Sequence, residues 1–207
     1  MKKLKIFSRR IVCQLSLWYH KRKVRKCNET VIMKEGLYME RIITKASDLL
    51  EKYEMAIAPP IDLEVICKGE NISIYAIDLS ELEKKHERTV SGVLLVKEQE
   101  KTIVVNKNDV PERQRFTVAH ELGHYFLHFD KNSSEENVLI SFRGERNKEE
   151  YQADMFAAEL LMPEELLRTR YEDLAVPYVS TLAKQFNVSS AAMRYRLDTL
   201  NMRYISL

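Results

Sequence analysis

Apolar residues recur at steps of three and four from Met39 onwards, and this spacing predicts an amphipathic helix. The apolar positions are Ile42, Ile43, Ala46, Leu49, Leu50 and Tyr53. We expect the helix to end before Pro59-Pro60, because proline lacks the backbone N–H that a helix requires. A second, shorter helix is predicted over residues 62–67, ahead of Gly69.

The middle of the chain carries the pattern of β-strands. Residues 72–77 alternate as one strand does. Residues 90–96 and 102–106 are rich in β-branched side chains and are separated by charged residues, so we expect them to form an antiparallel hairpin. The polar stretch 130–147 predicts a mobile loop.

Helical patterns dominate the second half. Pro111 opens a helix, residues 148–162 form another that Pro163 closes, and residues 164–207 read as helical with breaks near Pro177 and Asn187. Together with the strands, this order predicts an α+β fold with a small antiparallel sheet and a C-terminal helical cap.

Charge is distributed unevenly along the 207 residues. Residues 1–37 carry eleven Lys/Arg and two Glu, a net charge of +9, whereas the remainder carries 22 basic and 29 acidic residues, a net charge of −7. The mildly acidic body argues against direct nucleic-acid binding. We interpret residues 1–38 as a basic extension that is disordered or precedes a natural start at Met33 or Met39. An arm that touches nucleic acid or anionic lipid is the alternative.

Two features favour a cytoplasmic protein. The apolar run at 11–18 contains polar residues and leads into basic ones, so it predicts neither a signal peptide nor a transmembrane segment. The three cysteines, Cys13, Cys27 and Cys67, form no close pair. Their odd number argues against a disulfide framework and against a cysteine-ligated zinc site.

The segment His120-Glu121-Leu122-Gly123-His124 is the most informative for chemistry. Residues four apart on a helix lie roughly 40° and 6 Å from each other, so both imidazoles can converge on one Zn²⁺. Glu121 lies beside that face and is the candidate general base. The alternative is a surface helix with two histidines by chance. The apolar flanks argue against it, because burying His and Glu without a partner is costly. A glycine inside a helix costs about 1 kcal/mol against alanine, so Gly123 predicts a close neighbour.

A third metal ligand is required to leave one position open for water and substrate. His128 is a poor candidate, because its Cα should lie about 12 Å along the helix from that of His120. We interpret His128 as a core residue or one that supports a ligand.

The helix over 148–162 offers a better ligand. Small residues at 153, 157 and 158 let it approach the His120–His124 helix and bring the carboxylate of Glu150 to the metal. Glu149 is the rival, although it points about 100° away from the alanine stripe. Asp154, one turn further on, is placed to accept the other ring N–H of a ligand histidine.

Two runs of sequence carry a resemblance to the ImmA/IrrE family of metallopeptidases. They are RQRFTVAHELGH at residues 113–124, with a histidine four residues on, and EYQADMFAAELLMP at residues 150–163. The resemblance extends over roughly residues 40–203. It implies a compact zincin-like metallopeptidase domain, which we place at 39–163, followed by the cap at 164–207.

The resemblance also implies a function. It assigns His120, His124 and Glu150 as ligands of one Zn²⁺ per chain and Glu121 as the catalytic residue. Family members cleave helix-turn-helix transcriptional repressors and so relieve repression in phages, mobile elements or stress responses. Zinc is the default for such ligands, with manganese or iron conceivable. One hairpin strand is predicted to offer an open edge on which an extended substrate lies.

Two other functions stay open. Residues 180–200 resemble a helix-turn-helix, which would make the chain a DNA-binding regulator, although Arg194 and Arg196 are the only cations on its second helix. The apolar side of that motif is Leu182, Ala183, Phe186, Val188, Met193, Leu197 and Leu200. The other alternative is a metal-binding adaptor that has lost turnover, against which the intact Glu121 argues.

Overall fold

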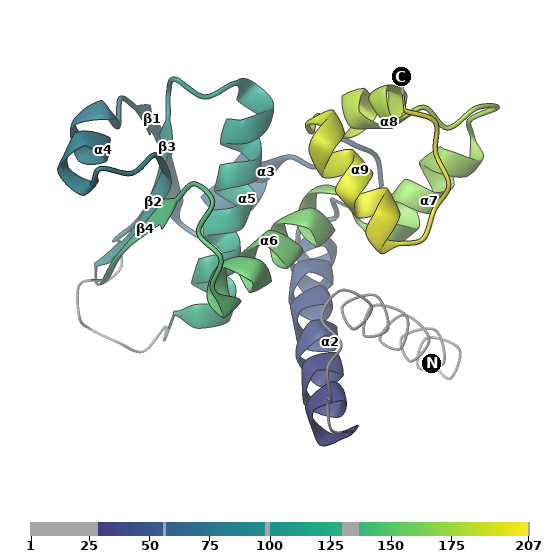
Figure 1. Ribbon diagram of the computed structural model, residues 1–207, viewed down its shortest axis with the longest axis horizontal. Coiled ribbons are helices and arrows are strands. Elements are labelled where there is room, and N and C mark those ends of the chain that lie inside the picture. The colour runs from purple at the N-terminus through teal and green to yellow at the C-terminus, as the bar shows by residue number, and fades with distance from the viewer. Residues whose placement is uncertain (1–28, 56, 98–99, 130–136, 207) are drawn as a thin grey trace.

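A four-stranded sheet forms one side of the protein in the computed structural model, which describes residues 29–55, 57–97, 100–129 and 137–206. Its strands are β1 (Ile72–Ile77), β2 (Val90–Lys97), β3 (Glu100–Asn106) and β4 (Asn137–Phe142), in the spatial order β1-β3-β2-β4. The predicted hairpin is present, since β2 and β3 pair antiparallel. A short helix, α4 (Ser80–His86), lies between β1 and β2 in the chain (Figure 1).

The sheet differs from the prediction in two respects. It is mixed rather than antiparallel, because β1 pairs parallel with β3. Alternation along one strand does not reveal the direction of its neighbour. Within the predicted loop 130–147, residues 137–142 form β4, which pairs antiparallel with β2. The polar residues on both sides concealed this short strand, and residues 130–136 lie outside the described part.

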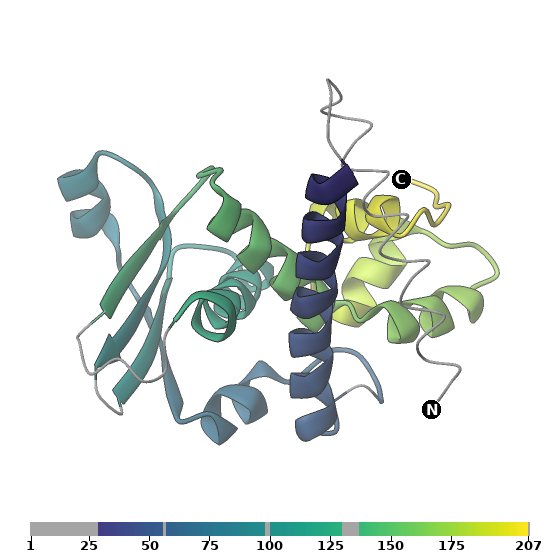
Figure 2. The same ribbon diagram turned by 90° about the horizontal axis from the view of Figure 1, so that it is seen from below.

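Helix α5 (Pro111–His128) lies against the sheet and is crossed by α6 (Lys148–Leu161), as Figure 2 shows from below. Nine consecutive residues of α5, 117 to 125, are buried, because the sheet covers one side of the helix and α6 the other. Pro111 occupies its first turn, where no helical N–H is lost. On α6, the side chain of Asn147 accepts a hydrogen bond from the N–H of Glu150 at 2.9 Å and so caps the helix.

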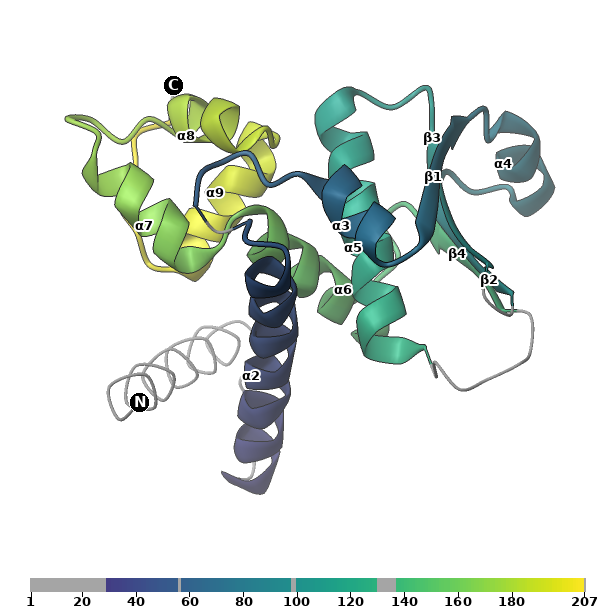
Figure 3. The ribbon, with the colours of Figure 1, turned by 180° about the vertical axis from the view of Figure 1, so that it is seen from behind.

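The long helix α2 (Glu29–Lys52) packs against α6 on the side away from the sheet (Figure 1). It begins ten residues before the predicted start at Met39, so that start is wrong. Its predicted apolar face is buried at Ile42, Ala46, Leu49 and Leu50. Residues 1–28 lie outside the described part. The predicted helix at 62–67 is α3 (Leu63–Gly69), beside α5 when seen from behind (Figure 3).

Three helices form the C-terminal part: α7 (Glu164–Glu172), α8 (Val179–Phe186) and α9 (Ser190–Thr199). The predicted breaks are present, with Pro177 between α7 and α8 and Asn187 in a left-handed conformation (φ 52°) between α8 and α9. All seven apolar positions of the predicted helix-turn-helix are buried, in a hydrophobic core that also contains Phe156 and Leu161 of α6.

A buried ion pair joins α9 to α6. The guanidinium of Arg196 contacts the carboxylate of Glu159 and also donates from Nε to the carbonyl of Met162 at 3.0 Å. Both charged side chains are more than nine-tenths buried. No helix in the described ranges has the length and apolar character to cross a bilayer.

The close crossing of α5 and α6 depends on Gly123. A methyl group there would lie 3.0 Å from both Cα and the carbonyl oxygen of Ala153, which are backbone atoms of α6. Gly123→Ala should therefore lower the free energy of unfolding by about 1–2 kcal/mol, because forced overpacking exceeds the gain in helix propensity. Denaturant unfolding measures this. A gain of about 1 kcal/mol, as on an unobstructed helix, would contradict the prediction.

Candidate metal centre

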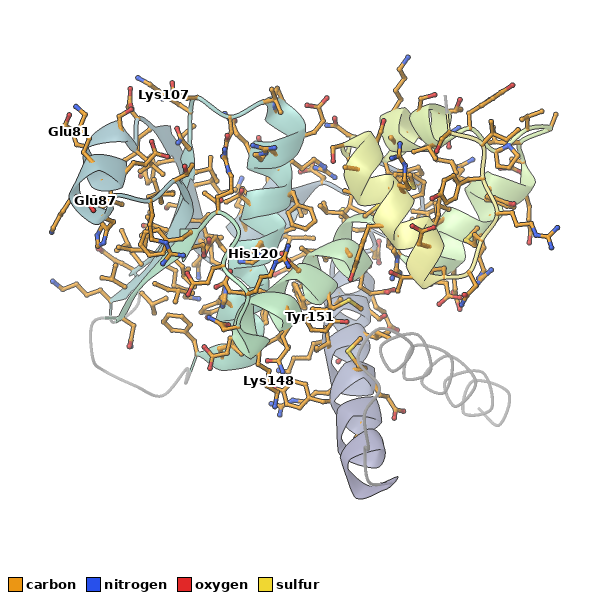
Figure 4. The ribbon with its side chains drawn as sticks, in the orientation of Figure 1. Glu81, Glu87, Lys107, His120, Lys148 and Tyr151 are labelled. Carbon is orange, nitrogen blue, oxygen red and sulfur yellow. The ribbon has the colours of Figure 1, made fainter. Side chains whose placement is uncertain are left out.

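Three buried side chains converge where α6 crosses α5. His120 and His124 are on consecutive turns of α5, and Glu150 is on the first turn of α6. Their exposed fractions are 8%, 1% and 8%. Figure 4 labels His120 on α5 beside the crossing helix that carries Tyr151. The four-residue step on one helix and the close approach of the second helix thus bring two imidazoles and one carboxylate together.

The distances between these groups are short enough for one ion. Nε2 of His120 lies 3.2 Å from Oε2 of Glu150, and Nε2 of His124 lies 3.1 Å from Oε1. The two Nε2 atoms are 3.1 Å apart. One ligand atom from each of the three residues lies within 4.8 Å of the other two. The neighbouring Glu149 is exposed, so Glu150 is the glutamate of this pair that faces the histidines.

Further hydrogen bonds orient both rings. Nδ1 of His120 lies 2.8 Å from a carboxylate oxygen of Asp154, which accepts its proton and leaves Nε2 free to bind a metal. Nδ1 of His124 lies 3.1 Å from Nδ1 of His128, whose Nε2 lies 2.9 Å from Oε1 of Gln152. We infer that Gln152 accepts from His128 and that His128 accepts from His124, so that His124 also presents a bare Nε2.

The electrostatics of the cluster follow from its contacts. Burial lowers the pKa of His120, but its hydrogen bonds with Asp154 and Glu150 outweigh this and raise the pKa to about 10. Burial raises the pKa of Glu150, but hydrogen bonds from both histidines lower it to about 2. Burial also lowers the pKa of His128, which favours the neutral ring that accepts from His124. With no ion bound, the raised pKa of His120 keeps a proton on its Nε2, and a metal bound there would displace that proton.

Glu121 lies next to this cluster without belonging to it. Its side chain is fully buried, and neither carboxyl oxygen has a hydrogen-bond partner among the described residues. Burial raises the pKa of Glu121, while the nearby His120 lowers it in part. A buried carboxyl without a partner is costly. Such a cost is not one that the fold itself explains.

The donor set fits zinc. Two imidazole nitrogens and one carboxylate are a ligand combination of catalytic zinc sites, in which a fourth position is open to water or substrate.

The contact between Asp154 and His120 is open to a direct test. Asp154→Ala should weaken zinc binding by about tenfold, at the lower end of the 10–100-fold range for groups that support a ligand. The lower end is expected because the side chain of Asp154 is 56% exposed, so water can replace it in part. Competition titration with a zinc indicator measures the change. An unchanged affinity would show that Asp154 does not support His120.

Residues 67–198 match the family described as IrrE N-terminal-like domain. Metallopeptidase ImmA of Bacillus subtilis is 30% identical over 140 residues, which cover 65% of this chain and 74% of the relative. The radiation response metalloprotease IrrE is 34% identical in Deinococcus radiodurans over 99 residues and 34% identical in Deinococcus deserti over 103 residues. Each match covers 46% of this chain, and 30% and 35% of the respective relative.

Fold, cluster and relatives define a family of metallopeptidases, and the chain is a member of it. That family is the ImmA/IrrE family. The matched region contains all of the residues of the cluster and those that orient it.

Proposed function

We propose that this protein is a zinc-dependent endopeptidase of the HExxH type. His120, His124 and Glu150 hold one Zn²⁺, and Glu121 is the general base. The single observation that carries the proposal is the fully buried carboxyl of Glu121 beside the three converging ligand groups. A purely structural metal site does not need a buried carboxyl that is not itself a ligand.

The protein's own residues perform the proton transfers. When bound, the zinc ion supplies Lewis acidity, which polarises the scissile carbonyl and makes water more acidic. Glu121 takes a proton from the attacking water and passes it to the departing amine. Burial raises the pKa of Glu121, which makes its carboxylate a stronger base for the first step. His128 and Gln152 keep His124 in the tautomer that binds through Nε2.

The substrate segment is expected to lie along β4. The sequence suggested a hairpin strand, but β2 and β3 each have a neighbour on both sides. In the described part of the sheet, β4 pairs with β2 alone and therefore has a second edge whose backbone groups can bind an extended peptide. Ser141 of β4 lies opposite Gly92, whose Cβ position would be 2.9 Å from Oε1 of Glu121, and this proximity of β4 to Glu121 supports the proposed substrate position.

As substrate we propose a helix-turn-helix transcriptional repressor in the cytoplasm, on the strength of the family resemblance. The DNA-binding alternative loses one of its two cations, because Arg196 is buried against Glu159 and only the other arginine, Arg194, is exposed. Too few charges remain on that helix for the phosphate contacts that nucleic-acid binding requires.

A cleavage assay tests the proposal. The zinc-loaded protein is incubated with a helix-turn-helix repressor encoded beside it, and fragments are identified by mass spectrometry. We expect cleavage that a chelator abolishes and added zinc restores. Cleavage of unfolded model proteins but not of the repressor would overturn the substrate. No cleavage of any protein or peptide by the zinc-loaded form would overturn the endopeptidase function itself.

A further inference from the structure

Two neighbouring side chains account for half of the six buried side-chain atoms without a hydrogen-bond partner among the described residues. They are the two carboxyl oxygens of Glu121 on α5 and the hydroxyl oxygen of Ser141 on β4. Ser141 is 2% exposed and Glu121 is fully buried, so bulk solvent satisfies neither group. A buried donor and a buried acceptor without partners rarely persist side by side, because each alone costs about 1–3 kcal/mol.

The sheet brings Ser141 to this position through an irregularity. The pairing of β2 with β4 shifts register between Val90 and Gly92, and after the shift Gly92 lies directly opposite Ser141. Such bulges re-aim side chains next to functional sites. Gly92 and Ser141 thus form one rung of the sheet, and α5 packs over β2.

Gly92 leaves the space that Glu121 fills. A methyl group at position 92 would lie 2.9 Å from Oε1 of Glu121 and 2.5 Å from Cγ2 of Thr117. Both distances are shorter than real contacts of a Cβ atom. The carboxyl of Glu121 therefore lies directly against the backbone of β2, at the rung that carries Ser141.

We propose that Ser141 is a positioning residue for Glu121. Its hydroxyl donates a hydrogen bond to one carboxyl oxygen of Glu121, and the glycine opposite it at position 92 admits that carboxyl to the sheet. With one oxygen held by Ser141, the other is fixed in direction toward the attacking water. The catalytic part of this inference rests on the proposed peptidase function, whereas the contact itself does not.

A double-mutant cycle in chelator tests the contact without any enzymatic activity. The four proteins are wild type, Ser141→Ala, Glu121→Leu and the double variant, and the readout is the equilibrium constant of unfolding. In the wild-type background, Ser141→Ala should raise the equilibrium constant of unfolding by about tenfold, as loss of a buried hydrogen bond does. In the Glu121→Leu background the same change should be neutral or stabilising, because it removes a hydroxyl that has lost its partner. Equal effects in both backgrounds would overturn the contact.

Kinetics of the zinc-loaded protein test the consequence. Ser141→Ala should lower kcat by about tenfold or more with KM and zinc affinity unchanged, because Glu121 is misdirected while substrate and metal still bind. Ser141→Cys has nearly the same volume but only a weak donor, so it should lower kcat similarly. Ser73→Ala, on the exposed face of β1, is the matched control and should change nothing.

The outcomes separate the two proposals. If Ser141→Cys keeps full kcat while Ser141→Ala loses it, the effect is packing and the positioning role is overturned. If the unfolding cycle shows coupling but wild type cleaves nothing, the peptidase function fails while the contact between Ser141 and Glu121 stands.

Discussion

Glu121→Gln should abolish peptide cleavage while leaving zinc content near one ion per chain. Glutamine has nearly the same shape but cannot accept and return a proton, so we expect kcat to fall by about 10²–10⁴-fold, the usual worth of a positioned acid–base group. The side chain of Glu121 is not among the three converging ligand groups, so the metal should remain. Zinc content by atomic absorption and kcat on the same preparation measure both effects.

The matched control is Glu112→Gln, the same change on the first turn of the same helix. It should leave kcat and zinc content unchanged. If Glu121→Gln retained cleavage within about tenfold of wild type, Glu121 would not be the general base.

Glu150→Gln should instead remove the metal. The neutral amide is a much weaker ligand than the carboxylate whose two oxygens lie 3.1 and 3.2 Å from the histidine nitrogens. We expect zinc affinity to fall by more than about 100-fold, beyond the range seen for groups that merely orient a ligand. Activity should fall with zinc occupancy. Competition titration and cleavage rates at several zinc concentrations measure the two together.

Glu149→Gln provides the control, because the adjacent glutamate is exposed. Its zinc affinity should equal that of wild type. The reverse result, with loss at 149 and none at 150, would mean that α6 presents its other face to the histidines and that the ligand assignment is wrong.

The parts of the site that follow from local geometry could be predicted. The step from His120 to His124 is set by the helix itself, and the small residues at 153 and 157 indicated which face of α6 approaches. The cost of Gly123 in a helix likewise indicated a close neighbour, which is the backbone of Ala153. Each inference concerned one helix or one pair of helices with a strong pattern.

The parts that depend on distant pairing could not be predicted. Nothing in residues 72–77 indicates that β1 lies beside β3 rather than β2. Ser141 was missed because its strand is short and lies among polar residues, although the apolar run from Val138 to Ile140 was a weak signal. Gln152 was missed because a glutamine on a helix is ordinarily exposed, and only the position of His128 makes it a hydrogen-bond acceptor.

The ion pair between Glu159 and Arg196 limits how far the protein can be shortened. Helix α6 carries Glu150 in its first turn and Glu159 near its end. The helix that supplies a proposed metal ligand is therefore held at its other end by the ion pair with α9. Truncation after residue 163 would strip the guanidinium from Glu159 and uncover Leu160, Leu161 and Met162. A minimal fragment for crystallisation or engineering therefore has to retain the C-terminal helices, even though they contribute none of the three converging ligand groups.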